Sequence, residues 1–363
     1  MLRQLAGSTL ALLLAAPAAQ GWNAPDPPPV EDPQSQPAYE ESIDVALATL
    51  VVRVFDSWGN PILGLAPGDF RVRVGGRDVT VVALDWVGQS PGKTPAAPAA
   101  RGAVPSAVAA DLVTPPAPGR LVVVFVQADL NPTRISGQMR LRPFTRELLD
   151  TLHGDDRVAV VSYDSHLKLW QDFGDDPAAT HAAIDEAMLY SPEHAVRRGE
   201  PVSLARYLDR DAARDAASPE RALELVGRAL APLPGEKTLI VLGWGIGRFD
   251  SAGVHMTPAY APAVRALHDA NAAVFVLDVT SADAHSLETG LEDIAAATGG
   301  AYYSTFRLPE IATTTLARAI SGYYVLTLDR GSLGEAEVGR LHVDLRKRTG
   351  TVLARPIAVA PPS

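Results

Sequence analysis

The sequence predicts an α/β protein built on a doubly wound, mostly parallel sheet of the Rossmann-like kind, with flanking strands that form a small β-sandwich. Continuous apolar runs at residues 121–126, 157–163, 237–242 and 273–277 alternate with segments of helical periodicity. Apolar runs without polar alternation are typical of parallel strands that are covered on both faces. Alternation of strands and helices on this scale predicts a doubly wound sheet.

The N-terminus has the features of a secretory signal. Arg3 precedes an apolar run over residues 5–19, and small residues follow up to Gly21, a pattern that suits cleavage by signal peptidase. The run of about 15 residues is shorter than the roughly 20 that a spanning helix needs, so we expect no transmembrane anchor. Residues 1–21 are thus predicted to be a signal peptide, and the protein is expected to be exported, either periplasmic or secreted.

Composition excludes several classes of protein. The 363 residues include no cysteine, which rules out disulfides and thiolate metal sites. A formal net charge of −10 argues against nucleic acid as a partner, because phosphate backbones are bound by clustered Lys and Arg. The compact basic cluster at residues 346–348 stands beside Thr349 and Gly350, where a β-turn is expected.

Two strand-rich flanks surround the predicted α/β domain. Residues 22–42 are rich in Pro, Asp, Glu and Gln, which predicts a disordered linker. Residues 43–88 contain three β-branched runs and form an N-terminal β unit, and the Pro- and Ala-rich residues 89–118 form a second linker. Residues 322–363 contain three more strands without helices between them. We expect the two sets of strands to pack together, with the α/β domain inserted between them.

The α/β domain itself is predicted to span residues 119–321. A further short strand is expected at residues 167–170. Helical periodicity and capping signals predict helices at residues 135–153, 177–189, 257–271, 286–298 and 308–320, and another that begins at Ser218.

Ordered segments in this region resemble the von Willebrand factor type A domain family. An apolar strand, the segment Asp129, Leu130, Asn131, Pro132, Thr133, an amphipathic helix and the Gly-Asp-Asp-Arg-Val segment that begins at Gly154 follow one another as in that family. The pieces at residues 236–242, 273–278 and 299–303 agree. The flanks at residues 52–70 and 321–328 are similar to those of a group of related secreted proteins frequent in acidobacteria. The resemblance covers roughly residues 43–358.

The resemblance implies a magnesium site at the carboxyl ends of the parallel strands, with altered ligands. Such a site needs hard oxygen ligands. Asp129, Asn131 and Thr133 stand where the family has an Asp-x-Ser-x-Ser motif, and Asp175 is the candidate for the second element. The third element is an Asp in the family, but here the turn reads Gly243, Trp244, Gly245, and an indole cannot bind Mg²⁺. Asp250 lies too far along the loop to replace it.

Two interpretations of this site stay open from the sequence. The segment from Asp129 to Thr133 is also typical of an ordinary turn that leads into a helix, so the site is either a weak Mg²⁺ site or a degenerate, metal-free one. Trp244 plugs the vacated ion position, anchors a partner or packs within its own loop. Asp250, on the same loop, is the second candidate contact for a partner. No cofactor is certain, and Mg²⁺ is the one candidate.

Enzymatic signatures are weak. No Gly-x-Ser-x-Gly elbow is present, and the contiguous Asp164, Ser165 and His166 are expected to form a solvated strand end, since neighbours in sequence cannot fold onto each other as a triad. We therefore expect an exported, non-catalytic, protein-binding module of the adhesion or scaffold type, with an unidentified protein partner. The alternatives are a hydrolase on the same sheet and a structural envelope or assembly component without a discrete ligand site.

Overall fold

The structure is a computed structural model that describes residues 47–88, 120–152, 155–329, 339–355 and 358–359. The signal peptide predicted at residues 1–21, both linkers and Gly154 lie outside the described residues. No helix in the described ranges is long and apolar enough to cross a membrane.

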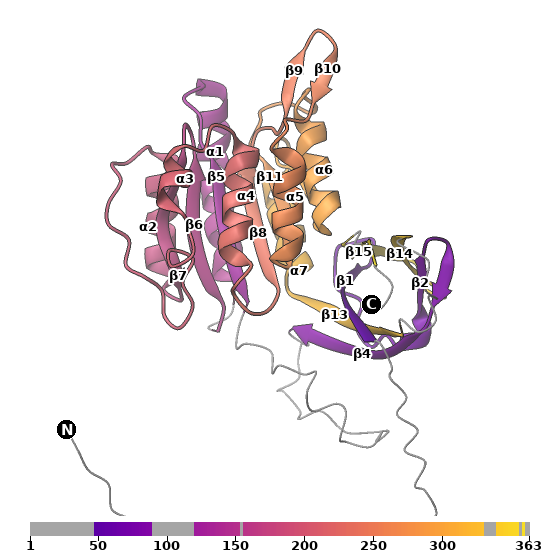
Figure 1. Cartoon of the computed structure of the whole chain (residues 1–363). Helices are drawn as coiled ribbons and strands as arrows, with labels where there is room; N and C mark the ends of the chain where they lie inside the picture. The colour runs from indigo at the N-terminus through magenta and orange to yellow at the C-terminus, as the bar shows by residue number, and fades with distance from the viewer. Residues whose placement is uncertain (1–46, 89–119, 153–154, 330–338, 356–357, 360–363) are drawn as a thin grey trace, which may run out of the picture. The chain divides into compact units, whose positions relative to one another are not determined.

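A six-stranded sheet in the order β12-β11-β8-β5-β6-β7 forms the centre of the α/β region (Figure 1). All neighbours in this sheet are parallel except β6 and β7, which pair antiparallel. The predicted fold class, a doubly wound and mostly parallel sheet, is confirmed. Its strands are β5 (Leu121–Gln127), β6 (Arg157–Tyr163), β7 (Leu167–Gly174), β8 (Lys237–Gly243), β11 (Ala272–Asp278) and β12 (Tyr302–Ser304).

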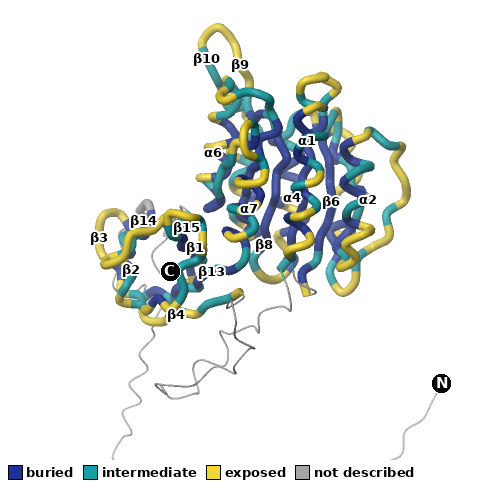
Figure 2. Tube along the Cα trace, turned by 180° about the vertical axis from the view of Figure 1, so that it is seen from behind, coloured by how far each residue is buried: buried dark blue, intermediate teal, exposed yellow. Residues whose placement is uncertain are grey.

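Helices cover both faces of this sheet, which explains the continuous apolar runs. In β5, Val123 and Phe125 pack into one core with α4, α5 and α6, while Val122 and Val124 pack into a second core with α1, α2 and α7. Figure 2 shows the strands as a buried layer between helices whose outer sides are exposed. The helices are α1 (Pro132–Asp150), α2 (Pro177–Met188), α3 (Arg210–Arg214), α4 (Pro219–Leu230), α5 (Tyr260–Asp269), α6 (Glu288–Thr298) and α7 (Pro309–Ala319).

Local capping fixes several helix ends close to their predicted places. The Ser218 hydroxyl accepts the Arg221 N–H at 3.2 Å at the start of α4, and Gly299 ends α6 with φ of +76°, a left-handed conformation that favours glycine. Helix α1 begins three residues earlier than predicted, because Asn131 caps it and Pro132 occupies its first position, where a missing N–H costs nothing.

The flanking strands form two four-stranded sheets, ordered β15-β1-β13-β4 and β16-β14-β2-β3. Each sheet combines strands from both flanks: Val51 of β1 pairs with Val325 of β13, and Val72 of β2 pairs with Val343 of β14. Inward-facing residues of the two sheets share one core, as in a β-sandwich. The strands are β1 (Leu47–Phe55), β2 (Phe70–Val74), β3 (Arg77–Val79), β4 (Val81–Gly88), β13 (Gly322–Asp329), β14 (Gly339–Leu345), β15 (Thr351–Ala354) and β16 (Ala358–Val359). Insertion of an independently folding domain at residues 119–321 stays a prediction.

Some strands differ from those expected. The described residues of each flank form four strands, where three were expected. Thr80 separates β3 from β4, and residues 355–357 separate β15 from β16; in both cases the two strands belong to different sheets. A hairpin of β9 (Arg248–Asp250) and β10 (Gly253–His255) was not predicted. It follows β8 directly and projects beyond the end of the sheet in Figure 1.

Candidate functional site

Asp129 lies just beyond the carboxyl end of β5, and its half-buried carboxylate is already paired. It accepts the Asn131 N–H at 2.9 Å and forms an ion pair with Arg134 of α1. The Arg134 guanidinium in turn lies 3.4 Å from the centroid of the Trp244 ring, within the range of a cation–π contact. Carboxylate, guanidinium and indole form a three-membered stack, which we call the Asp129–Arg134–Trp244 stack.

Asn131 and Thr133 serve the start of helix α1. The Asn131 side-chain oxygen accepts the Thr133 N–H at 3.0 Å, which caps the helix. Thr133 is exposed. The amide oxygen that was a candidate ion ligand therefore satisfies a backbone donor that the helix would otherwise leave unpaired.

Asp175 does not join the other three candidates. Because β7 runs antiparallel to β6, its last residue, Gly174, pairs with Val158 near the start of β6. Asp175 therefore lies at the edge of the sheet opposite to Asp129, where Arg157 pairs with it at 3.0 Å. The expectation that it could supply the second ligand is corrected by this reversal of the chain.

Trp244 is held in place by a buried side chain that the sequence analysis missed. The Gln127 amide oxygen accepts the N–H groups of Trp244 and Gly245 at 2.9 and 3.2 Å, and its amide nitrogen donates to the Gly245 carbonyl at 2.7 Å. The half-buried indole packs against the core on the α1 side. This geometry favours the interpretation in which Trp244 plugs the vacated ion position over the one in which it extends to anchor a partner. The available signal was a polar residue at the end of an otherwise apolar strand.

Asp250 lies in the β9–β10 hairpin and is engaged locally. Its carboxylate accepts the Ala252 N–H at 2.8 Å and lies 3.3 Å from His255 Nε2. These contacts close the tight turn between the two short strands. The structure places Asp250 on the same loop as Trp244 without bringing it into the Asp129–Arg134–Trp244 stack.

A second carboxylate at this edge, Asp278, ends β11 and is buried. It accepts hydrogen bonds from His285 Nε2 at 2.8 Å, the Tyr302 hydroxyl at 2.7 Å and the Thr280 N–H at 2.8 Å. Burial raises the pKa of Asp278, but these donors outweigh it and hold the pKa below its usual value. Glu288 accepts the same Tyr302 hydroxyl at 3.0 Å. Burial and these two carboxylates raise the pKa of Tyr302, so the phenol stays protonated.

The residues at this edge do not fit a divalent ion. Asp129 is occupied by a guanidinium, Asn131 by a helix N–H, and Asp175 lies at the other edge. No group of three or more His, Asp or Glu side chains within the described ranges is arranged to hold a metal. An ion at Asp129 would have to displace Arg134, and hard cations need several oxygen ligands that are not offered here.

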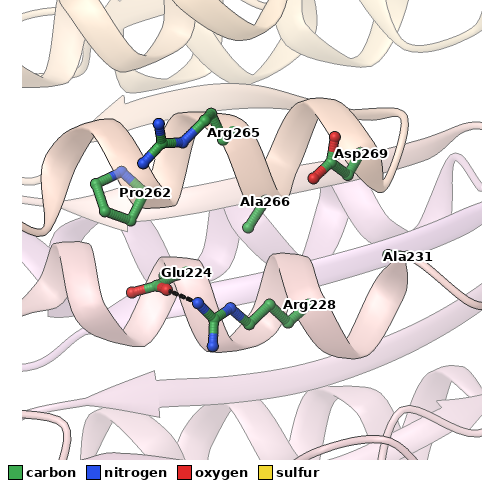
Figure 3. A pocket seen from close by; sticks show the side chains of 7 residues that line it. All are labelled: Glu224, Arg228, Ala231, Pro262, Arg265, Ala266 and Asp269. Carbon is green, nitrogen blue, oxygen red and sulfur yellow. Dashed lines mark ion pairs between the residues drawn. The ribbon is translucent and has the colours of Figure 1, made fainter.

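A shallow hollow of about 200 Å³ lies between α4 and α5 (Figure 3). Glu224 in this hollow pairs with Arg228 at 2.5 Å. Gly227 lets the helices approach closely, since a Cβ there would come within 2.8 Å of the Ala266 backbone. The hollow results from helix packing, and none of its lining residues belongs to the candidate site at the carboxyl ends of the strands.

No family model and no curated protein matches this chain. Similar solved structures include a variant of the PilB minor pilin from Streptococcus sanguinis, at 14% identity over 56% of this chain and 62% of the pilin, with a TM-score of 0.35. BatB from Bacteroides thetaiotaomicron matches at 14% identity over 56% of this chain and 98% of its own, with a TM-score of 0.38.

Proximal thread matrix protein 1 from the mussel byssus, with a zinc-occupied MIDAS motif, matches at 15% identity over 62% of this chain and 49% of its own, with a TM-score of 0.35. The match thus spans less than two thirds of the pilin and about half of the mussel protein. At these identities and TM-scores the likenesses carry no conclusion about the activity or partner of this chain.

Proposed function

We propose that this chain is an exported protein-interaction module, of the adhesion or scaffold type, that contacts its partner through the loops at the carboxyl ends of β5, β8 and β12 without a bridging ion. One observation carries the proposal. Each of these loops exposes a large apolar side chain: Leu130 at 75%, Phe249 at 62% and Leu308 at 59%. The three side chains follow strands that end at the same side of the sheet, and exposed apolar side chains are a source of the area that becomes buried in a complex.

The polar part of the same edge supports an ion-free contact. The Asp129–Arg134–Trp244 stack neutralises the carboxylate within the chain. Asp278 is likewise used internally, by His285 and Tyr302. Neither carboxylate is therefore free for an ion that would bridge to a partner.

The test is capture of partners from the native organism's extracts with the full chain as bait, in the presence and absence of EDTA. The variant Leu130→Ser/Phe249→Ser/Leu308→Ser is expected to lose the partner that the unaltered chain retains in EDTA. The matched control is Trp58→Ser/Val82→Ser, which removes two exposed apolar side chains of the sandwich and should retain it. A partner that EDTA releases, or that the triple variant still captures, would contradict the proposal.

A second candidate function, hydrolysis, is favoured by one observation. The turn between β6 and β7 brings Ser165 Oγ within 3.1 Å of His166 Nδ1, and His166 Nε2 within 2.9 Å of Glu193. The carboxylate on the second His166 nitrogen is Glu193, so the contiguous Asp164, Ser165 and His166 do not themselves form a triad, as expected. Ser165 Oγ also bonds to Asp164 at 3.1 Å, and Ser165 is exposed. Labelling of Ser165 by a fluorophosphonate, abolished in His166→Ala, would support this function; an unlabelled chain would remove it.

A further inference from the structure

Strand β7 is an edge strand of the six-stranded sheet, and its two halves differ in how that edge is covered. In the second half of β7, the buried Asp172 carboxylate accepts hydrogen bonds from the N–H groups of Gly199 and Leu204 at 2.9 and 2.6 Å, and from the Ser203 hydroxyl at 2.6 Å. These bonds fix the segment of residues 199–205 against β7. A carboxylate buried with several donors is a strong local clamp.

In the first half of β7, the main-chain N–H and carbonyl groups of Leu167 and Leu169 point away from the sheet. The Ala128 N–H donates to the Tyr163 carbonyl at 2.9 Å, so Tyr163 directs its main-chain groups toward β5. Tyr163 pairs with Leu167, and Val161 with Leu169. Where the main-chain groups of a β6 residue point away from β7, that residue makes no hydrogen bond to the β7 residue opposite. The N–H and carbonyl of Leu167 and Leu169 therefore point to the outer side of β7.

These outward groups have no protein partner in the described part of the chain. No hydrogen bond reaches the N–H or carbonyl of Leu167 or Leu169 from the segments that follow β7. Leu167 is nevertheless buried, with 4% of its surface exposed. Main-chain groups without partners on an edge strand are a template for another strand. The partly exposed Leu169 offers them at the groove, whereas those of Leu167 lie deeper.

A groove of about 220 Å³ runs along this open half of the edge. Its apolar lining includes Leu167, Leu169 and Leu208, and the segment of residues 193–196 forms a wall. Arg210 and Arg214 also line it. Arg210 has no carboxylate partner among the described residues, and Arg214 has only the exposed Asp211 at 3.5 Å. The residues that line the groove include three cations, Lys168, Arg210 and Arg214, and one carboxylate, Glu193. Lys168 is paired with Asp164, so Arg210 and Arg214 are the cations that can meet a partner.

We propose that this groove binds an extended segment of a partner protein that carries acidic side chains. The segment adds to the sheet as a strand beside Leu167 to Leu169, and its carboxylates meet Arg210 and Arg214. Main chain is the ligand that satisfies donors and acceptors at strand spacing, and alternate side chains supply the specificity. Opposite charge selects the acidic class. None of the groove residues belongs to the Asp129–Arg134–Trp244 stack or to the three exposed apolar loops, so this surface is distinct from the one proposed above.

The first test uses the full chain and fluorescein-labelled short peptides of alternating glutamate and valine, followed by fluorescence polarisation. The glutamate peptide is expected to bind at least about ten-fold more tightly than a lysine–valine peptide of equal length. N-methylation of its inward main-chain nitrogens should abolish binding, and so should Arg210→Glu/Arg214→Glu. Equal affinity for both peptides, or no binding at millimolar peptide, would overturn the proposal.

The second test separates main-chain pairing from side-chain packing. Leu169→Pro removes an outward N–H without removing a bond to β6, and proline is tolerated on edge strands for this reason. Leu169→Ala is the matched control, because it truncates the same side chain and keeps the N–H. We expect Leu169→Pro to bind the glutamate peptide at least about ten-fold more weakly than Leu169→Ala. Equal binding by the two would overturn strand addition.

Two further outcomes are decisive. If Leu169→Pro does not fold, the N-methylated peptide tests the same bond from the ligand's side. If the unaltered chain self-associates in sedimentation and the Leu169→Pro variant does not, the edge is occupied by a second copy of this chain, and the acidic-partner proposal is wrong.

Discussion

Asp129 and Asp278 occupy corresponding places, each just after or at the end of a parallel strand at the same edge of the sheet, yet they are neutralised in different ways. Asp129 is half-buried and pairs with Arg134, which is itself covered by Trp244. Asp278 is buried and accepts bonds from His285, Tyr302 and Thr280. Asp129 is thus neutralised by a full positive charge near solvent, whereas Asp278 is stabilised by several hydrogen-bond donors away from solvent.

The difference in how the two carboxylates are neutralised predicts different roles for them. A buried carboxylate that loses its donors leaves an uncompensated charge, whereas a partly exposed ion pair is screened by water. We therefore expect Asp278 to matter mainly for stability. Asp129 should matter mainly for which ligands the edge admits.

The largest expected effect is that of Asp278→Asn. The new amide nitrogen would face donors from His285 and Tyr302, so we expect a loss of about 3 kcal/mol in the free energy of unfolding. Asp129→Asn, the matched change at the corresponding place, should cost less than about 1 kcal/mol. Urea unfolding of both variants checks the comparison. A loss of similar size in the two would break it.

Acid titration sharpens the same contrast. Because the pKa of Asp278 is held below its unfolded value, its contribution is complete above the unfolded pKa and is lost as pH falls through the folded pKa. The stability of the unaltered chain should decline on that acid limb more steeply than that of Asp278→Asn. Parallel curves from thermal unfolding at a series of acid pH values would count against this assignment.

Lys237, a buried cation at the amino end of β8, extends the comparison to a positively charged group. Lys237 is 2% exposed, donates to the Leu233 carbonyl, and burial lowers its pKa from 10.5 to about 8. Between these values the unfolded chain holds more protons than the folded one, so stability should rise with pH by at most about 3 kcal/mol.

Chemical unfolding between pH 8 and about 9, where unfolded tyrosines are still mostly protonated, measures the first part of this rise. Lys237→Met should flatten the curve and stabilise the chain at neutral pH. Lys347→Met, at an exposed lysine, should leave the slope unaltered. A slope that survives in Lys237→Met would assign the effect to another group.

A smaller stability effect than that of Asp278→Asn concerns the support of Trp244. Gln127→Leu removes three hydrogen bonds to the turn of Trp244 and Gly245, and we expect a loss of about 2 kcal/mol. Hydrogen exchange at the Trp244 and Gly245 amides should accelerate, because Gln127 is their acceptor. Unchanged exchange at both amides would mean that another part of the loop holds Trp244.

Much of the fold was predictable because apolar runs bounded by capping signals determine it. Residues 121–126 and 237–242 read directly as buried strands, and Ser218 and Gly299 marked helix ends. The placement of Asp175 failed, although the three-residue connection between Tyr163 and Leu167 permits only an antiparallel hairpin. The short connection between these two strands is therefore the sequence signal for the position of Asp175.

The site was less predictable because its contacts join distant elements. Arg134 lies only five residues beyond Asp129, but its stacking on Trp244 depends on the loop after β8. Gln127 reaches the same loop across more than a hundred residues. Asp278 meets Tyr302 of β12. Periodicity and spacing predict elements, whereas these contacts depend on how the elements pack.

The central claim is that Arg134 closes the ion position at Asp129, and calorimetry with Mg²⁺ and Mn²⁺ on the full chain tests it most directly. The unaltered chain is predicted to give no binding heat at millimolar ion, and Asp129→Ala should behave identically. Saturable binding by the unaltered chain that Asp129→Ala abolishes would contradict the account, since the carboxylate would then be free to hold an ion despite its guanidinium partner.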